Sequence, residues 1–233
     1  MADVSRETSL ARDPVVLAEI FPPERLPLLD AYAELLATEG VTRGLIGPRE
    51  VPRLWDRHLV NCGLLSPFIP EGATVADLGS GAGLPGVVIA IARPDLRVTL
   101  VEPMARRVDF LEEVANRLGL EGLGIVRARA EQWPDAPQFD VVTARAVAAL
   151  PKLLGWAMPL VAPEGALMAM KGSSAEAEIA AAQAELRRWR ARAEVATSSV
   201  PGSSVTTVVR VVRDPTSGIG WQSSSARRRQ RHR

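Results

Sequence analysis

The sequence predicts an α/β fold in which a helical N-terminal extension precedes a mostly parallel, seven-stranded sheet. From residue 73 onward, short apolar runs alternate with helical patterns, which is typical of a parallel sheet covered by helices on both faces. The last two apolar runs, 194–200 and 205–212, are joined by a short Pro-Gly-Ser-Ser turn. Because a parallel connection needs about a dozen residues or more, these two strands are predicted to form an antiparallel hairpin.

Residues 1–72 are expected to be helical. Apolar residues recur at helical spacing over 22–40, and a second helix is predicted over 49–66. In that second helix Arg49, Arg53 and Arg57 are four residues apart, which places them on one face. That face is either a solvated charged side or a stripe that contacts phosphates.

The rest of the chain divides by its hydrophobic pattern. The other expected strands are 74–78, 97–101, 124–127, 139–144 and 166–170, and the other expected helices are 84–92, 104–118, 150–161 and 175–192. We assign 73–213 to one sheet-containing domain and 214–233 to a basic, disordered tail. The tail holds five arginines, and without them 23 basic residues face 27 acidic ones. A polyanion must therefore be held by local basic patches and not by bulk attraction.

Composition favours a cytoplasmic protein. No apolar run approaches the length of a membrane span, and the first residues lack the apolar stretch of a secretory signal. The single cysteine, Cys62, lies in an apolar helical pattern that predicts a packed thiol and not a nucleophile. No cluster has the spacing of metal ligands, so no metal is expected.

The most informative motif is Asp77-Leu78-Gly79-Ser80-Gly81-Ala82-Gly83-Leu84-Pro85-Gly86, which reads as a strand end, a glycine turn and a helix start. Gly79, Gly81 and Gly83 let backbone N–H groups come close to a ligand. Glu102, at the end of the next strand, presents a carboxylate to a ribose. The pattern predicts an adenosine-containing cofactor, and Gly81-x-Gly83-x-x-Gly86 also fits a nicotinamide dinucleotide.

Two further observations favour S-adenosylmethionine over NAD. Asp77, two residues before Gly79, suits the amino group of a ligand and would repel a pyrophosphate. The antiparallel end of the sheet is unlike the nicotinamide-binding fold, which ordinarily continues with parallel strands. Ala130 and Glu131, which follow the third strand, are expected to line the adenine pocket through backbone groups. The Glu131 side chain then either contacts the base or faces solvent.

Two cations end the next strands on the same side of the sheet. Arg145 follows the fourth strand and Lys171 ends the fifth, so both can reach a cofactor or a substrate. The alternatives are that Arg145 pairs with a core acid and that Lys171 is an ordinary exposed lysine. His58 and Asn61 lie just beside the arginine face of the second helix.

These motifs resemble the glucose-inhibited division protein B (GidB) family, ribosomal RNA small subunit methyltransferase G. The resemblance covers about residues 20–212 and is carried by the glycine block and four segments: 54–61 (LWDRHLVN), 102–107 (EPMARR), 145–148 (RAVA) and 171–172 (KG). It implies the class I S-adenosylmethionine-dependent methyltransferase fold. It also implies methylation of N7 of a guanosine in the 530 loop of 16S ribosomal RNA, in the decoding region. The cofactor positions that it implies are Gly79, Leu84, Glu102, Ala130, Glu131 and Arg145. Family members often have Asp where this chain has Asn61.

Guanine N7 has an in-plane lone pair and loses no proton when it is methylated, so the reaction needs positioning more than a base. Arg145, His58 and Lys171 are therefore expected to orient the guanosine or its phosphates. Arg49, Arg53 and Arg57 are the expected RNA contacts. The expected partner is 16S RNA or the small ribosomal subunit, and the expected state is a monomer. Three alternatives stay open: a methyltransferase for a small molecule or protein, an NAD-dependent oxidoreductase, and an RNA-binding protein without turnover.

Overall fold

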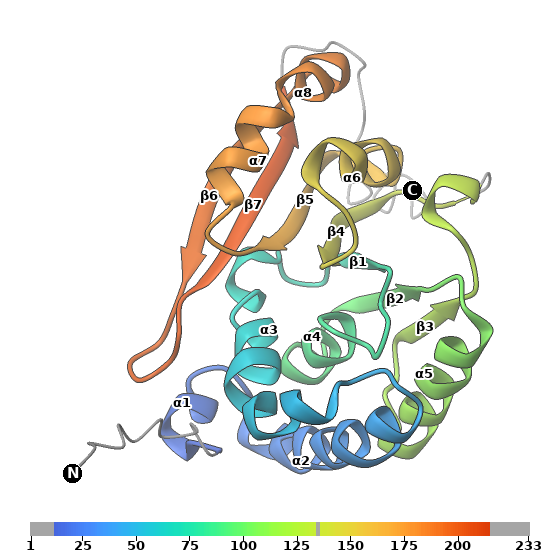
Figure 1. The fold of residues 1–233 in the computed structure, drawn as a ribbon, viewed down its shortest axis with the longest axis vertical. Coiled ribbons are helices and arrows are strands. Elements are labelled where there is room, and N and C mark those ends of the chain that lie inside the picture. The colour runs from blue at the N-terminus through green and yellow to red at the C-terminus, as the bar shows by residue number, and fades with distance from the viewer. Residues whose placement is uncertain (1–11, 134–135, 215–233) are drawn as a thin grey trace, which may run out of the picture.

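A seven-stranded sheet forms the centre of the computed structural model, which describes residues 12–133 and 136–214 (Figure 1). The strands are β1 (Thr74–Leu78), β2 (Arg97–Val101), β3 (Leu123–Val126), β4 (Phe139–Arg145), β5 (Val161–Lys171), β6 (Ala191–Ser198) and β7 (Thr206–Arg213). Their order across the sheet is β3-β2-β1-β4-β5-β7-β6. β1 to β5 are parallel, and β7 runs antiparallel to both β5 and β6. The predicted α/β class and terminal hairpin are confirmed, and β7 lies inside the sheet while β6 forms its edge.

Helices precede the sheet and cover both of its faces. The α-helices are α1 (Pro14–Ala18), α2 (Leu26–Leu35), α3 (Asn61–Gly63), α4 (Gly86–Ala92), α5 (Ala105–Leu118), α6 (Leu150–Ala157), α7 (Ala175–Ala181) and α8 (Gln183–Trp189). The 3-10 helices are η1 (Pro23–Arg25), η3 (Pro48–Arg53), η5 (Ser66–Phe68) and η6 (Ala130–Gln132), and the π-helical segments are η2 (Leu36–Gly40) and η4 (Leu54–Val60).

The core consists of two hydrophobic clusters, one on each face of the sheet. On one face Val75 and Leu100 pack with α4, α5 and the N-terminal helices. On the other face Ala76 and Leu78 pack with α6, α7 and α8. Neighbouring residues of one strand point to opposite faces, so the alternation along β1 builds both clusters. The N-terminal helices thus share a core with the sheet.

The expected helix over 49–66 is wrong in detail. The chain forms the 3-10 helix η3, which contains Pro52, and then the π-helical η4 before α3. Proline cannot donate a backbone hydrogen bond within a regular helix, which is consistent with the tighter first segment. A spacing of four therefore does not by itself align Arg49, Arg53 and Arg57 on one face. All three side chains are nevertheless exposed.

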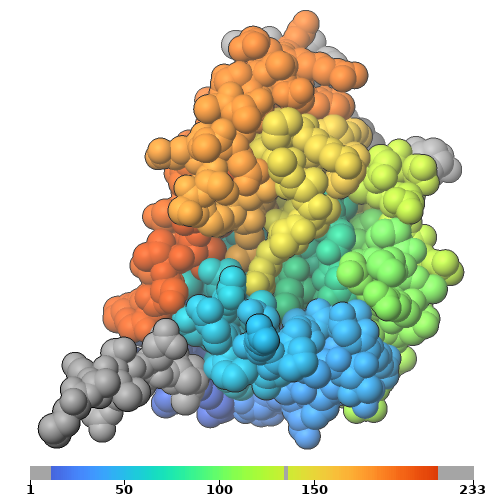
Figure 2. Space-filling model, viewed as in Figure 1, coloured from blue at the N-terminus to red at the C-terminus, as the bar shows by residue number. Residues whose placement is uncertain are grey.

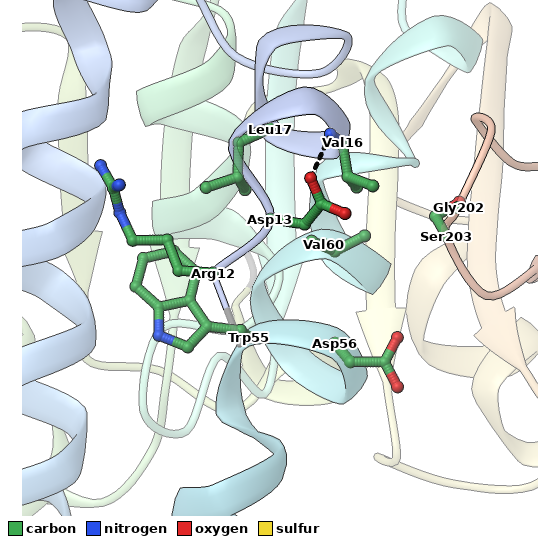
Figure 3. Close-up of a pocket in the computed structure, with 9 residues that line it drawn as sticks. All are labelled: Arg12, Asp13, Val16, Leu17, Trp55, Asp56, Val60, Gly202 and Ser203. Atoms are coloured by element: carbon green, nitrogen blue, oxygen red, sulfur yellow. Dashed lines mark hydrogen bonds between the residues drawn. The ribbon is translucent and has the colours of Figure 1, made fainter. Parts of the chain in front are cut away.

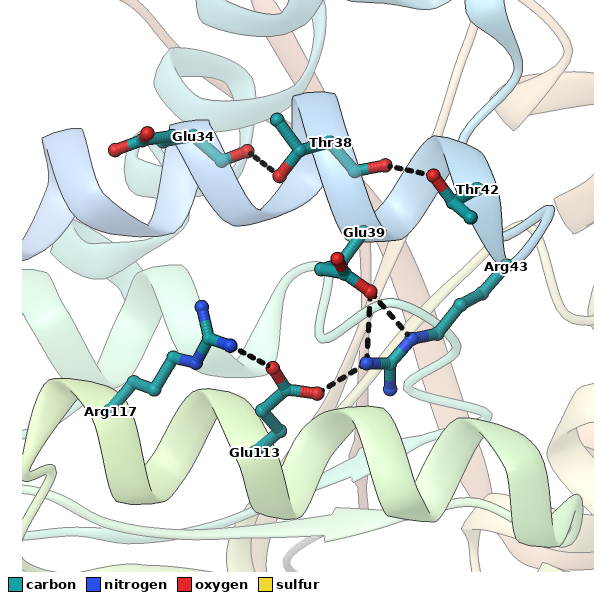
Figure 4. A network of polar contacts seen from close by, with 7 residues as sticks. All are labelled: Glu34, Thr38, Glu39, Thr42, Arg43, Glu113 and Arg117. Atoms are coloured by element: carbon teal, nitrogen blue, oxygen red, sulfur yellow. Dashed lines mark hydrogen bonds and ion pairs between the residues drawn. The ribbon is translucent and has the colours of Figure 1, made fainter.

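Arg43 fastens the end of the first long helical stretch to α5. Its guanidinium bonds Glu39 at 3.0 Å and also pairs with Glu113, which Arg117 holds at 2.6 Å (Figure 4). The guanidinium also lies over the Phe110 ring at 5.6 Å. Two carboxylates thus balance the charge of Arg43, and the ion pair with Glu113 joins the N-terminal helices to α5.

The turn of the terminal hairpin reaches back to the N-terminal helices. Gly202 and Ser203 line a small, mostly apolar pocket together with Val16 and Trp55 (Figure 3). Next to it, the Ser204 hydroxyl donates to Asp56 of η4 at 2.8 Å. The last hairpin and the first helices therefore support each other.

Several boundaries differ from the predicted ones: α6 ends at Ala157 and not at 161, and β6 begins at Ala191 and not at 194. β5 begins at Val161 and not at 166. Its pairing with β4 shifts in register between Phe139 and Val141, so that residues 162–165, the expected turn, belong to the strand. The expected helix over 175–192 is divided into α7 and α8 at Ala182, and Arg190, with φ of 48°, ends it early. No helix in the described part of the chain is long and apolar enough to cross a bilayer.

Candidate cofactor and substrate site

A cavity, about 790 Å³ with its open mouth included, lies where β1 and β2 end. Its wall includes Gly79, Glu102, Ala130, Glu131 and Val147. In Figure 2 it lies where the teal, green and yellow segments meet. This is the carboxyl edge of the parallel strands, where open α/β sheets bind ligands. The structure therefore brings four of the predicted cofactor residues, which come from three different segments, to one cavity.

Glu102 fixes the glycine turn from across the cavity. Its side chain is 1% exposed, and its two oxygens accept hydrogen bonds from the N–H groups of Gly81 and Met104, both at 3.0 Å. Arg107 approaches the same carboxylate at 3.5 Å. A carboxylate has about four lone-pair sites, so acceptor capacity remains for a ribose hydroxyl beside these three donors. Glu102 can both shape the turn and bind a ligand.

Gly79 has a conformation and a neighbour that exclude a side chain. Its φ is +65°, and a Cβ there would lie 2.9 Å from Cγ2 of Val147. Only glycine adopts this backbone conformation without strain. Val147, from the loop after β4, can therefore close down on the turn and form one wall of the cavity.

Asp77 lies beneath the turn and does not line the cavity. It is fully buried, and its oxygens accept from the Gly86 N–H at 3.0 Å and the Thr143 hydroxyl at 3.1 Å. Burial raises the pKa of Asp77 to about 6, although the hydrogen bonds from Gly86 and Thr143 lower it. In this structure Asp77 ties β1 to the start of α4 and to β4, and its contact with a ligand stays a prediction.

The other predicted cofactor residues surround the cavity without forming its wall. Gly81 and Gly83 lie in the turn, and a Cβ at Gly83 would lie 2.8 Å from the Tyr32 hydroxyl. Leu84 is buried just after them. Arg145 points away from the cavity, toward the segment that holds His58 and Cys62.

Arg145 links the sheet to the helical extension. It donates from Nη1 to the Cys62 sulfur at 3.2 Å, and from Nη2 to the Arg57 carbonyl at 3.3 Å and to Nδ1 of His58 at 2.7 Å. The partner of Arg145 is thus not the core acid that the alternative required. Burial raises the pKa of the Cys62 thiol, which supports the packed thiol expected from the sequence.

Lys171 is mostly buried and paired. Its ammonium contacts Glu178 at 2.7 Å and donates to the Ala148 carbonyl at 2.8 Å. Glu178 also accepts from the Leu150 N–H at 2.8 Å. Burial opposes ionisation of Glu178, but the hydrogen bonds from Lys171 and Leu150 prevail and lower its pKa. This pair clamps the loop between β4 and α6, so the alternative of an ordinary exposed lysine does not apply.

Some site residues were missed by the sequence-based reasoning. Met104, Arg107 and Trp156 line the cavity, and the buried Nε of Arg107 has no hydrogen-bond partner among the described residues. Met104 and Arg107 follow Glu102 closely, which is a usable signal, whereas Trp156 lies on α6 and nothing in its spacing points to the cavity. Asn61, one turn from His58, bonds the Thr206 hydroxyl at 2.8 Å and joins α3 to β7.

Comparison with known proteins identifies the family. The sequence profile described as "GidB: rRNA small subunit methyltransferase G" matches residues 25–203. The chain belongs to the GidB family. A GidB relative from Nocardioides sp., named ribosomal RNA small subunit methyltransferase G, is 56% identical over 229 residues, 97% of this chain and 91% of the relative. A relative of the same name from Thermobifida fusca is 57% identical over 192 residues, 81% of this chain and 80% of the relative.

Solved structures share the GidB fold at low identity. Mitomycin 7-O-methyltransferase MmcR matches with a TM-score of 0.55 and 17% identity, over 78% of this chain and 60% of that one. A ribosomal protein L11 methylase from Lactobacillus delbrueckii subsp. bulgaricus matches with a TM-score of 0.52 and 15% identity, over 68% and 79% of the two chains. The names of these two proteins refer to different substrates. The shared fold therefore indicates a methyltransferase architecture, and only the family indicates the substrate.

The methyl donor of this GidB enzyme is S-adenosylmethionine. The cavity fits such a ligand: Glu102 keeps acceptor capacity for a ribose hydroxyl, Arg107 has an unused buried donor, and Met104, Val147 and Trp156 supply apolar wall. Family membership sets aside the NAD-dependent oxidoreductase and the protein without turnover. In the described residues no group of three or more His, Cys, Asp or Glu side chains is placed to hold a metal ion.

Proposed function

We propose that this enzyme transfers a methyl group to N7 of a guanosine in the 530 loop of 16S ribosomal RNA. The observation that supports this most is the similarity to small-subunit rRNA methyltransferases along 97% of the chain, which spans every residue of the cavity wall. The positively charged sulfur of S-adenosylmethionine makes its methyl group electrophilic. The protein has to hold N7 in line with that methyl group.

The polar residues near the cavity suit positioning and not proton transfer. Both ring nitrogens of His58 are engaged, by Arg145 and by Glu50, and the Lys171 ammonium is paired with Glu178. His58, Arg145 and Lys171 are therefore not placed to accept a proton from a substrate. This arrangement is sufficient for N7 methylation, which releases no proton at the reacting nitrogen, and we infer that these residues fix the shape of the site.

We infer that the helical extension, residues 1–72, faces the RNA. Arg49, Arg53 and Arg57 are exposed on η3 and η4, next to the Arg145 contact. Arg43, which is paired with two carboxylates, is a weaker candidate. N7 faces the deep, narrow major groove of A-form RNA, so the target guanosine must lie in an accessible loop. We further propose that the enzyme acts in the cytoplasm as a monomer.

Mapping of N7-methylguanosine in 16S RNA from a strain that lacks the gene tests this proposal. We expect one guanosine of the 530 loop to lose its methyl group, and the purified enzyme with S-adenosylmethionine to restore it. Naked 16S RNA and small subunits are to be assayed side by side, because either can be the substrate. A methyl group lost at another atom or in another RNA contradicts the proposal.

A further inference from the structure

Among the described residues, Glu50 is the carboxylate that contacts both Arg57 and His58. Its Oε1 pairs with Arg57 at 3.2 Å, and its Oε2 lies 2.9 Å from Nε2 of His58. His58 in turn contacts Arg145, so a continuous polar chain runs from the exposed arginine segment to the end of β4. This series of contacts crosses from the helical extension to the sheet. No sequence pattern predicts it, because Glu50 and His58 are eight residues apart across η3 and η4.

The hydrogen bonds define the protonation state of His58. A guanidinium has only donors, so Arg145 can approach Nδ1 at 2.7 Å only if Nδ1 carries a lone pair. The proton of neutral His58 is then on Nε2, where it is donated to the carboxylate of Glu50. A protonated ring would point an N–H of Nδ1 at the guanidinium, placing two donors and two positive charges together.

The charges around His58 support the neutral form. Burial and the charge of Arg145 lower the pKa of His58, and Arg57 on the same segment lowers it further. Glu50 from η3 is the group that raises it, through a hydrogen bond and its charge. The hydrogen bond from His58 correspondingly lowers the pKa of Glu50. Arg145 also donates to the sulfur of Cys62, and its charge lowers the pKa of buried Asp77.

The series of polar contacts ends at the cofactor cavity. Directly after Arg145, Ala146 has φ of 55°, a conformation that costs a non-glycine residue energy. Ala146 and Val147 line the cavity, and Val147 lies against Gly79. An arginine held in place on one side of this strained turn limits where Ala146 and Val147 can lie.

We propose that Glu50 is a positioning residue: it anchors His58 through Nε2, so that Nδ1 holds Arg145 and thereby the 145–147 loop at the cofactor cavity. This inference deepens the proposed function and rests on it for the activity assay. It does not make Glu50 or His58 a proton carrier. Glu50 instead belongs to a series of contacts with His58 and Arg145 that forms only while His58 is neutral.

Two substitutions separate anchoring from charge. Glu50→Ala removes the acceptor, and we expect the single-turnover methylation rate at neutral pH to fall about tenfold, with a smaller change in S-adenosylhomocysteine affinity. Glu50→Gln keeps an oxygen that can accept from Nε2, so its rate should stay within about threefold of wild type. Glu194→Gln, which removes the charge of an exposed partner of Arg210, is the matched control.

The pH profile gives a readout that simple loss of packing would not move. In the wild type, methylation should fall as acid protonates His58 and breaks its contact with Arg145. Glu50→Gln removes the charge that raises the pKa of His58, so its acidic limb should shift to lower pH even though its rate at neutral pH is retained. An unshifted limb in Glu50→Gln overturns the proposal.

Nitrogen-15 NMR of the His58 ring tests the contacts of His58 with Glu50 and Arg145 without any RNA. We expect wild-type His58 to be neutral with its proton on Nε2 near neutral pH, and His58→Gln identifies its signals. A proton on Nδ1, or equal rates for Glu50→Ala and Glu50→Gln, overturns the positioning role. A wild-type enzyme with the expected His58 spectrum that fails to methylate 16S RNA instead contradicts the proposed function.

Discussion

The hydroxyl of Tyr32 on α2 donates a 2.7 Å hydrogen bond to the carbonyl oxygen of Ala82 in the glycine turn. Both residues are buried, and Tyr32 is the only tyrosine of the chain. The residues lie fifty positions apart and belong to the helical extension and to the turn beside the cavity. The extension therefore supports the cofactor site as well as facing outward.

Tyr32→Phe tests this support. The substitution keeps the ring and leaves the buried Ala82 oxygen without its partner, which should lower the free energy of unfolding by about 1–3 kcal/mol. Urea unfolding measures the loss, and calorimetric titration with S-adenosylhomocysteine should show weaker binding, because the turn is less restrained. Unchanged affinity together with unchanged stability would remove Tyr32 from the account of the site.

Asp77→Asn should change how stability depends on pH. With a folded-state pKa of about 6, Asp77 binds its proton more tightly in the folded than in the unfolded chain. Its contribution to stability is therefore fully present below about pH 4 and is lost as pH rises through about 6. The loss is of order 3 kcal/mol by linkage. Relative to wild type, Asp77→Asn should gain stability as pH rises over this window in parallel urea titrations, and a constant difference would contradict it.

Glu102→Gln should weaken cofactor binding. The amide has a single oxygen, so one of the two N–H groups that Glu102 now accepts, from Gly81 and Met104, would face another donor. We expect S-adenosylhomocysteine to bind about tenfold more weakly or worse in calorimetry. Glu121→Gln, an exposed glutamate after α5, is the control and should bind normally. Normal affinity in Glu102→Gln would separate Glu102 from the ligand.

Lys171 and Glu178 should behave as a coupled pair. Removing either partner leaves a mostly buried charge without its counterion and frees the loop before α6. In a double-mutant cycle with Lys171→Met and Glu178→Gln, we expect a coupling energy of about 1–3 kcal/mol in the free energy of unfolding. Additive effects would show that the clamp contributes nothing as a pair.

Replacement of Arg49, Arg53 and Arg57 with Gln should weaken RNA binding and make it less dependent on salt. Losing three phosphate contacts reduces the slope of log K against log salt by up to about two. Affinity for S-adenosylhomocysteine should stay within about twofold. Replacement of Arg187, Arg188 and Arg192, which are exposed on α8 and β6, removes the same charge elsewhere. Equal losses in both triple variants would show that RNA responds to overall charge and not to η3 and η4.

Much of the sheet follows from local pattern. β1 and β2 begin and end where their apolar runs do, and the link between β6 and β7, residues 199–205, is too short for anything but antiparallel pairing. What the pattern lacks is long-range information. The early start of β5 depends on how it pairs with β4, and the break at Ala182 has no glycine or proline to mark it.

The site divides in the same way. Glycine and acid spacing indicated Gly79 and Glu102 because strand ends of a parallel sheet converge by topology. The partners of His58, Arg145 and Lys171 cannot be predicted from the sequence, since they come from segments whose relative placement is set by packing. The pattern over 49–66 predicts a regular helix, in which residues eight apart are too distant to touch. The 3-10 and π-helical segments instead bring Glu50 next to His58.

The position of β7 between β5 and β6 has a genetic consequence. A frameshift or stop codon just before Thr206 deletes an interior strand, although it spares every residue of the cavity wall. The truncated chain would expose unpaired backbone along β5 and leave β6 without any partner. Alleles truncated before β7 should therefore be as severe as much earlier ones.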